Sequence, residues 1–210
     1  ICVNNADENC SGESDEGCAT IMCSQDVTVN AGTVANVSAS GTGLSNFSWR
    51  IVSQPTGAGS SAEWTPNPPN QGNVGFRPYI VGIYTLEATA RDAQGRTQSC
   101  QVQVTAQAHG LRVELTWNGA GDVDLHLHNA NNTPWFDSSR SVPRASADSC
   151  YYANCIPNGP LWTSASSAGA GANPRLDVDN VTSDGPENIN LDAPLLNHEY
   201  TIGVHNYARA

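Results

Sequence analysis

The chain has 210 residues, a formal net charge of -11 and only 14% charged residues, so uncharged polar side chains dominate its polar surface. It lacks the clustered Lys and Arg that neutralise phosphates, which excludes a nucleic-acid-binding protein. No apolar run is long enough for a membrane-spanning helix. The length suits two compact domains, and the composition favours a secreted β protein over a cytosolic helical enzyme.

The chain contains seven cysteines, at positions 2, 10, 18, 23, 100, 150 and 155. None of them forms a CxxC or CxxCH motif, which argues against redox-active dithiols, zinc ribbons and c-type haem. We interpret them as disulfides, and this predicts an oxidising compartment, either secreted or at the cell surface. The odd number leaves one cysteine without a partner in this chain. The lack of an initiator Met and of a signal-peptide core at Ile1 predicts that the chain begins inside a longer precursor or after processing.

Residues 1–20 form an acidic, Cys-rich segment with almost no apolar side chains. Oxygen-bearing residues recur there at alternate positions with a glycine in sixth place, as in calcium loops of the EF-hand type. The predicted calcium ligands are Asp7, Asn9, Ser11, the carbonyl of Glu13, Asp15 and, as an extra carboxylate, Glu16. Without a metal or a disulfide the segment has too little apolar surface to order itself. The alternative interpretation is a solvated acidic linker.

This segment resembles the metal-binding repeat of delta-proteobacterial surface proteins. It departs from the repeat at Ser11, where an Asp is usual, and this change is expected to weaken calcium binding. Cys2 and Cys10 bracket the loop, so a disulfide between them would brace it. Cys18 is then the odd thiol.

Residues 23–106 are predicted to form a first β-sandwich. Apolar and polar residues alternate along short stretches, which is the pattern of strands with one buried face. These stretches are residues 26–29, 34–39, 47–52, 82–90 and 100–104. Asp92 and Gly95 supply the residues of a tight hairpin. About seven strands in this length predict an immunoglobulin-like sandwich.

Three stretches of this block, Phe47-Ser48-Trp49 and residues 82–86 and 90–95, resemble the PKD-like domains of bacterial surface proteins. The resemblance implies a seven-strand sandwich with Trp49 in the core and Tyr84 near a strand corner. It also implies a disulfide between Cys23, before the first strand, and Cys100 on the last. Such domains serve as spacers or adhesive modules.

Residues 107–110 connect this block to a second β-rich block, residues 111–210. Strands are predicted at residues 111–117, 121–128 and 199–205. The stretches 123–127, 173–180 and 185–189 resemble a C-terminal β-sandwich of myxobacterial and related surface proteins, a family without a characterised activity. The resemblance implies another strand or two beyond Ala210, and therefore an exposed edge open to pairing.

A second acidic cluster is predicted in this block. Alternate residues of a strand share a face, so Asp122 and Asp124 point the same way. If their strand neighbours the loop of residues 177–187, the carboxylates converge on a second calcium ion. The candidate ligands are Asp122, Asp124, Asp177, Asp179, Asp184 and Glu187. The alternative is ordinary polarity at turns and strand edges.

His126 and His128 form an i, i+2 pair on the same face, a pattern able to bind a transition metal. No third ligand is evident from the sequence, so the pattern favours ordinary surface residues. Cys150 and Cys155 are predicted to close a small disulfide loop. Its Tyr151, Tyr152 and Asn154, with the flanking Trp135 and Trp162, fit either core packing, which we favour, or an exposed patch for sugars or proteins.

No GxSxG, HExxH or P-loop motif occurs, so we expect no enzymatic activity. The sequence predicts an all-β, calcium-supported extracellular or cell-surface module for adhesion or assembly. Its expected partners are other protein chains or surface glycans, with self-assembly as one form. The alternatives are a filament or coat subunit completed by strand exchange, and a non-catalytic appendage of a secreted hydrolase.

Overall fold

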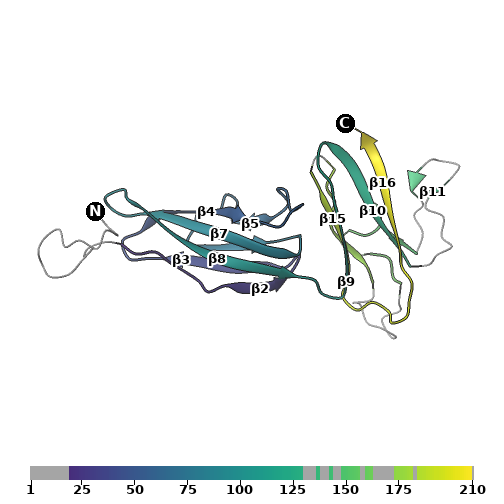
Figure 1. Cartoon of the computed structure of the whole chain (residues 1–210), viewed down its shortest axis with the longest axis horizontal. Helices are drawn as coiled ribbons and strands as arrows, with labels where there is room; N and C mark the ends of the chain where they lie inside the picture. Colours follow the sequence, from purple (N-terminus) through teal and green to yellow (C-terminus); the bar gives the residue numbers. More distant parts are fainter. Residues whose placement is uncertain are drawn as a thin grey trace, which may run out of the picture.

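The computed structural model describes residues 19–129, 136–137, 142–143, 148–156, 159–162, 173–181 and 184–209. All regular secondary structure in these residues is β, which confirms the all-β prediction. Two β-sandwiches follow one another along the long axis of the molecule (Figure 1). The described part of the chain holds no helix of the length and apolarity that a membrane crossing requires.

The first sandwich consists of eight strands in two four-stranded sheets. The strands are β1 (Met22–Cys23), β2 (Val27–Asn30), β3 (Ala35–Ser40), β4 (Ser45–Ser53), β5 (Glu63–Thr65), β6 (Asn73–Arg77), β7 (Gly82–Arg91) and β8 (Thr97–Gln107). One sheet has the order β1-β3-β6-β5 and the other β2-β8-β7-β4. The expected count of about seven agrees with these eight, because the first strand is split into two parts: β1 pairs with β3 in one sheet and β2 pairs in parallel with β8 in the other.

The order of strands in these sheets corresponds to the ABED and GFC sheets of an immunoglobulin-like sandwich. Trp49 on β4 is buried between the sheets, and its Nε1 donates to the carbonyl of Gln71 at 3.0 Å. The Tyr84 hydroxyl, at the start of β7, donates to the carbonyl of Ile80 at 2.9 Å. This is the tyrosine corner of immunoglobulin-like domains, as the resemblance implied for Tyr84.

The alternation of apolar and polar residues in the sequence predicts which side chains form the core of the first sandwich. On β7 the residues Tyr84, Leu86, Ala88 and Ala90 are all buried, while the residues between them are less so. The hairpin after β7 closes where Asp92 and Gly95 predicted it, with Gly95 at a φ of 78°. The expected disulfide between Cys23 and Cys100 is present, with a Cα–Cα distance of 5.7 Å. Cys23 lies within β1 rather than before it.

The second sandwich packs two three-stranded sheets, of order β13-β10-β16 and β14-β15-β9, beside a two-stranded pair. Its strands are β9 (Leu111–Thr116), β10 (Gly121–His128), β11 (Phe136–Asp137), β12 (Val142–Pro143), β13 (Ser149–Cys150), β14 (Arg175–Val178), β15 (Pro186–Leu191) and β16 (Thr201–Arg209). Leu125 and Leu127 of one sheet face Ile189 and Leu191 of the other in a small buried core. The predicted disulfide Cys150–Cys155 is present and belongs to that core.

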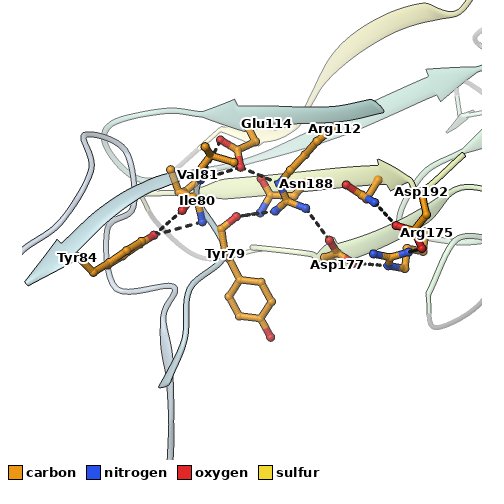
Figure 2. Close-up of polar contacts among 11 residues, drawn as sticks. Tyr79, Ile80, Val81, Tyr84, Arg112, Glu114, Arg175, Asp177, Asn188 and Asp192 are labelled. Atoms are coloured by element: carbon orange, nitrogen blue, oxygen red, sulfur yellow. Dashed lines mark hydrogen bonds and ion pairs between the residues drawn. The ribbon is translucent and has the colours of Figure 1, made fainter. Parts of the chain in front are cut away.

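A buried polar junction joins the two sandwiches (Figure 2). The carbonyl of Tyr79, in the loop before β7, accepts from Arg112 Nη2 at 2.5 Å and from Asn188 Nδ2 at 3.0 Å. The Val81 amide donates to Glu114 at 3.1 Å. This loop is the one that the Tyr84 hydroxyl holds, so the tyrosine corner fixes the part of the first sandwich that meets the second.

Arg112 is the centre of this junction. Its side chain is only 2% exposed and forms ion pairs with Glu114 at 2.7 Å and with Asp177 at 2.8 Å. Asp177 also pairs with Arg175, which continues the network to Asp192. Each charged side chain of this network has an oppositely charged neighbour, which offsets the cost of removing these charges from water.

Candidate cation-binding site

Carboxylate side chains from β10, from the end of β14 and from β15 lie close together in the second sandwich. Asp122 and Asp124 lie at the start of β10, where a bulge shifts its pairing with β16. Asp179 directly follows β14, and Glu187 lies near the start of β15, which pairs with β14. Since β10 packs against β15 across the core, these chain segments meet although more than fifty residues separate them.

Asp124, Asp179 and Glu187 each present a carboxylate oxygen within 4.8 Å of the others. Glu187 is completely buried, and one of its oxygens accepts from the Leu125 amide at 2.5 Å. The other oxygen, Oε1, has no hydrogen-bond partner among the described residues. A buried carboxylate oxygen without a partner, beside two further carboxylates, is costly unless a cation or a proton neutralises it.

The electrostatics of the cluster reflect this crowding. Burial, together with the neighbouring Asp179 and Asp124, raises the pKa of Glu187 to about 9 against the lowering effect of the hydrogen bond from the Leu125 amide. Burial and the nearby Asp122 also raise the pKa of Asp124. The pKa of Asp122 is raised by burial and by Asp179. Without a bound cation, Asp122, Asp124 and Glu187 therefore keep their protons to a higher pH than free carboxyl groups do, because burial and mutual repulsion disfavour the charged forms.

The cluster opens to solvent through a hollow of about 220 Å³. Its lining residues are Asp122, Asp124, Tyr152, Asp179, Val181 and Tyr207. A small ion can therefore reach Asp122, Asp124 and Asp179 from the surface, whereas the buried Glu187 does not line the hollow. Carboxylate oxygens are the ligands of hard cations, and Ca²⁺ accepts six to eight oxygens in a flexible arrangement. Asp124, Asp179 and Glu187 could hold such an ion, which would need further oxygen ligands from elsewhere.

Two of the six predicted ligands lie elsewhere. Asp177 is held in the junction by Arg112 and Arg175, so its charge is already neutralised. Asp184 accepts a hydrogen bond from the Gly119 amide at 2.5 Å, at an exposed turn. The structure thus brings together Asp122, Asp124, Asp179 and Glu187 and leaves these two outside the cluster.

The sequence favoured surface positions for His126 and His128, and the structure does not place them there. His126 and His128 are both buried, and His126 stacks on Tyr151 with a centroid distance of 4.9 Å and an interplanar angle of 8°. Sequence reasoning missed His205 of β16, whose Nδ1 lies 3.1 Å from Asp124 Oδ2. No local signal marks His205, because only the pairing of β10 with β16 brings it to Asp124.

The aromatic residues in and beside the Cys150–Cys155 loop that the structure describes pack into the core and do not form an exposed patch. Tyr151 is buried, and Tyr152 and Trp162 pack against the core of the second sandwich. The first predicted calcium loop, with Asp7, Asn9, Ser11, Glu13, Asp15 and Glu16, lies outside the described residues. The same holds for Cys2, Cys10, Cys18 and Trp135.

No protein-family model matches the chain, and no curated protein matches it either. Among solved structures it is similar to the titin M3 domain, at 16% identity and a TM-score of 0.28, over 41% of this chain and 96% of that one. It is also similar to the titin domains z1z2 in complex with telethonin, at 11% identity and a TM-score of 0.28, over 89% of each chain. At these scores the immunoglobulin-like assignment depends on the strand order and the tyrosine corner of this chain.

Proposed function

We propose that the chain is a non-catalytic extracellular module whose second sandwich binds calcium and which serves adhesion or structural assembly. One observation carries the proposal: Glu187 is completely buried, its Oε1 has no hydrogen-bond partner among the described residues, and it presents a carboxylate oxygen within 4.8 Å of oxygens of Asp124 and Asp179. A bound Ca²⁺ neutralises these charges and ties β10, β14 and β15 together, so it stabilises the sandwich.

Extracellular use is supported by the two disulfides, since such bonds persist in oxidising compartments. The buried junction supports a load-bearing or spacing role, because it fixes the two sandwiches to each other through Arg112. The PKD-like character of the first sandwich and the surface-protein character of the second remain proposals from their motifs. Secretion, and protein chains or surface glycans as partners, are likewise proposed.

The melting temperature in millimolar Ca²⁺ and in EDTA tests the calcium proposal. A ligand at one hundred times its Kd adds about 2.7 kcal/mol to the free energy of unfolding, so we expect a clear upward shift with Ca²⁺. Glu187→Gln should abolish the part of this shift that belongs to the second sandwich. In EDTA near neutral pH the same variant should melt close to the wild-type temperature, because a glutamate whose pKa is raised to about 9 is already uncharged there.

The acidic segment of residues 1–20 is a separate candidate for calcium and requires its own control. Asp7→Asn with Asp15→Asn removes two of its predicted ligands and leaves the second sandwich unchanged. A calcium shift that persists in this control but disappears in Glu187→Gln supports the site in the second sandwich. A wild-type melt that does not respond to Ca²⁺ would remove both calcium sites.

Self-assembly through β16 is a second candidate, and a specific feature favours it. Ile202 and Val204 lie opposite Leu127 and Leu125, so they point toward the core side of their sheet. They nevertheless remain 54% and 59% exposed, on a strand that pairs with β10 alone among the described strands. Such an edge is a template for strand addition. Light scattering should show concentration-dependent association that Val204→Lys suppresses; a monomer at every concentration would refute this candidate.

A further inference from the structure

The β13-β10-β16 sheet carries a second group of metal-binding side chains, which shares Asp124 with the carboxylate cluster. Potential ligand atoms of Asp124, His126 and His205 all lie within 4.8 Å of one another. Asp124 and His126 are 2% and 3% exposed, and the His205 side chain is 23% exposed. This group combines two imidazoles with a carboxylate, whereas the calcium site offers carboxylates.

The pairing of β10 with β16 creates this group. Asp124 lies directly opposite His205, and His126 lies opposite Gly203. Residues opposite each other in an antiparallel pair share a face, and so do alternate residues of one strand. His126 and His205 are therefore diagonal neighbours on the face that bears Asp124, and Gly203 places no side chain between them.

The surrounding contacts hold the donor groups in place. Asp124 Oδ2 lies 3.1 Å from His205 Nδ1, and the ring of His126 stacks on the buried Tyr151. The ring of Tyr207 lies edge-on to His205 with a centroid distance of 6.0 Å. In metal sites, neighbouring residues orient the ligands in this way, by packing against the imidazole rings and by hydrogen bonding to the carboxylates.

We propose that Asp124, His126 and His205 bind a divalent transition-metal ion, with Zn²⁺ as the expected occupant. Imidazole nitrogens suit Zn²⁺, Co²⁺ and Ni²⁺, whereas Ca²⁺ prefers oxygen ligands alone. In a tetrahedral zinc site the ligand atoms lie about 3.3 Å apart. The ligand atoms here lie within 4.8 Å of one another, so small side-chain rotations would bring them to the distances that a zinc ion requires. Three protein ligands leave a fourth position for water or for a group from a partner molecule.

This site does not depend on calcium. It shares only Asp124 with the proposed calcium site, and the two oxygens of one carboxylate can serve two ions. Glu187→Gln removes a proposed calcium ligand and leaves the imidazole site intact. His205→Asn removes an imidazole ligand and leaves Asp179 and Glu187 unchanged.

Cobalt(II) provides a direct test, because its visible d–d absorption is weak for the hydrated six-coordinate ion and becomes strong when the ion enters a four-coordinate site. Titration of the EDTA-stripped full chain with Co²⁺ should produce this absorption at one equivalent, and Zn²⁺ should abolish it. His205→Asn and His126→Asn should each weaken Co²⁺ binding about tenfold or more, while Glu187→Gln should retain it. His109→Asn is the matched control, because His109 is exposed in the connector and remote from the site.

Circular dichroism of each variant checks that the fold is kept. If His126→Asn unfolds because its ring is buried, His205→Asn still decides, since His205 is partly exposed. A wild-type chain that gives only the weak absorption of hydrated Co²⁺, or equal Co²⁺ affinity in wild type and folded His205→Asn, would overturn the proposal. Either result leaves the calcium proposal standing, because the calcium response is measured separately with Glu187→Gln.

Discussion

Replacement of Arg112 by Met is expected to destabilise the protein by about 3–5 kcal/mol, because it removes one partner of a buried ion-pair network. Arg112 neutralises Glu114 and Asp177 and donates to the carbonyl of Tyr79. Methionine has a similar length and fills much of the space, so lost packing is a minor part of the cost. Glu114 then loses its ion-pair partner, and Asp177 keeps only Arg175 as an oppositely charged neighbour.

Urea unfolding measures this loss, and Arg50→Met is its matched control. Arg50 also pairs with a glutamate, Glu87, but its side chain is 63% exposed. Exposed pairs contribute about 0–1 kcal/mol, so the control should unfold almost as the wild type does. Hydrogen exchange should show that Arg112→Met also loosens the loop at Tyr79 and Val81. Equal unfolding midpoints for the two variants would contradict a junction centred on Arg112.

Loss of the Cys23–Cys100 disulfide is expected to cost about 4 kcal/mol, from the chain entropy of a loop of this size. The two cysteines are 77 residues apart in sequence and join β1 to β8. The bond therefore restricts nearly the whole unfolded first sandwich. The Cys23→Ser, Cys100→Ser double variant should melt well below the wild type.

The second disulfide provides an internal comparison. Cys150 and Cys155 are only 5 residues apart, and the same relation gives about 2 kcal/mol for so short a loop. The Cys150→Ser, Cys155→Ser double variant should therefore lose about half as much stability. A larger loss from the short loop than from the long one would show that packing of Cys150 and Cys155 in the core outweighs chain entropy.

Local patterns in the sequence predict much of the fold. The alternation along β7 gives the buried face, and Asp92 with Gly95 gives the hairpin after it, because both depend on neighbouring residues only. The complete burial of β15 could not be predicted this way. Ile189 and Leu191 face the core, but Asn188 faces the junction and donates to Tyr79, more than one hundred residues away.

The candidate site could be predicted in part. Carboxylates at Asp122, Asp124, Asp179 and Glu187 stand out as an acidic pattern, and their convergence needs only that β10 lies near β15. Asp177 belongs to the same pattern in sequence but is taken by Arg112, a residue of another strand. His205 joins the site only through the register of β10 against β16, which no local pattern encodes.

Calorimetric titration of the full chain with Ca²⁺ tests the central claim most directly, when wild type, Asp179→Asn and Asp184→Asn are compared. Both substitutions remove one charge from the same region, but only Asp179 faces Asp124 and Glu187. We predict that Asp179→Asn loses one calcium-binding event, or weakens it about tenfold or more, and that Asp184→Asn binds as the wild type does. Wild-type stoichiometry and affinity in folded Asp179→Asn would contradict a calcium site in the second sandwich.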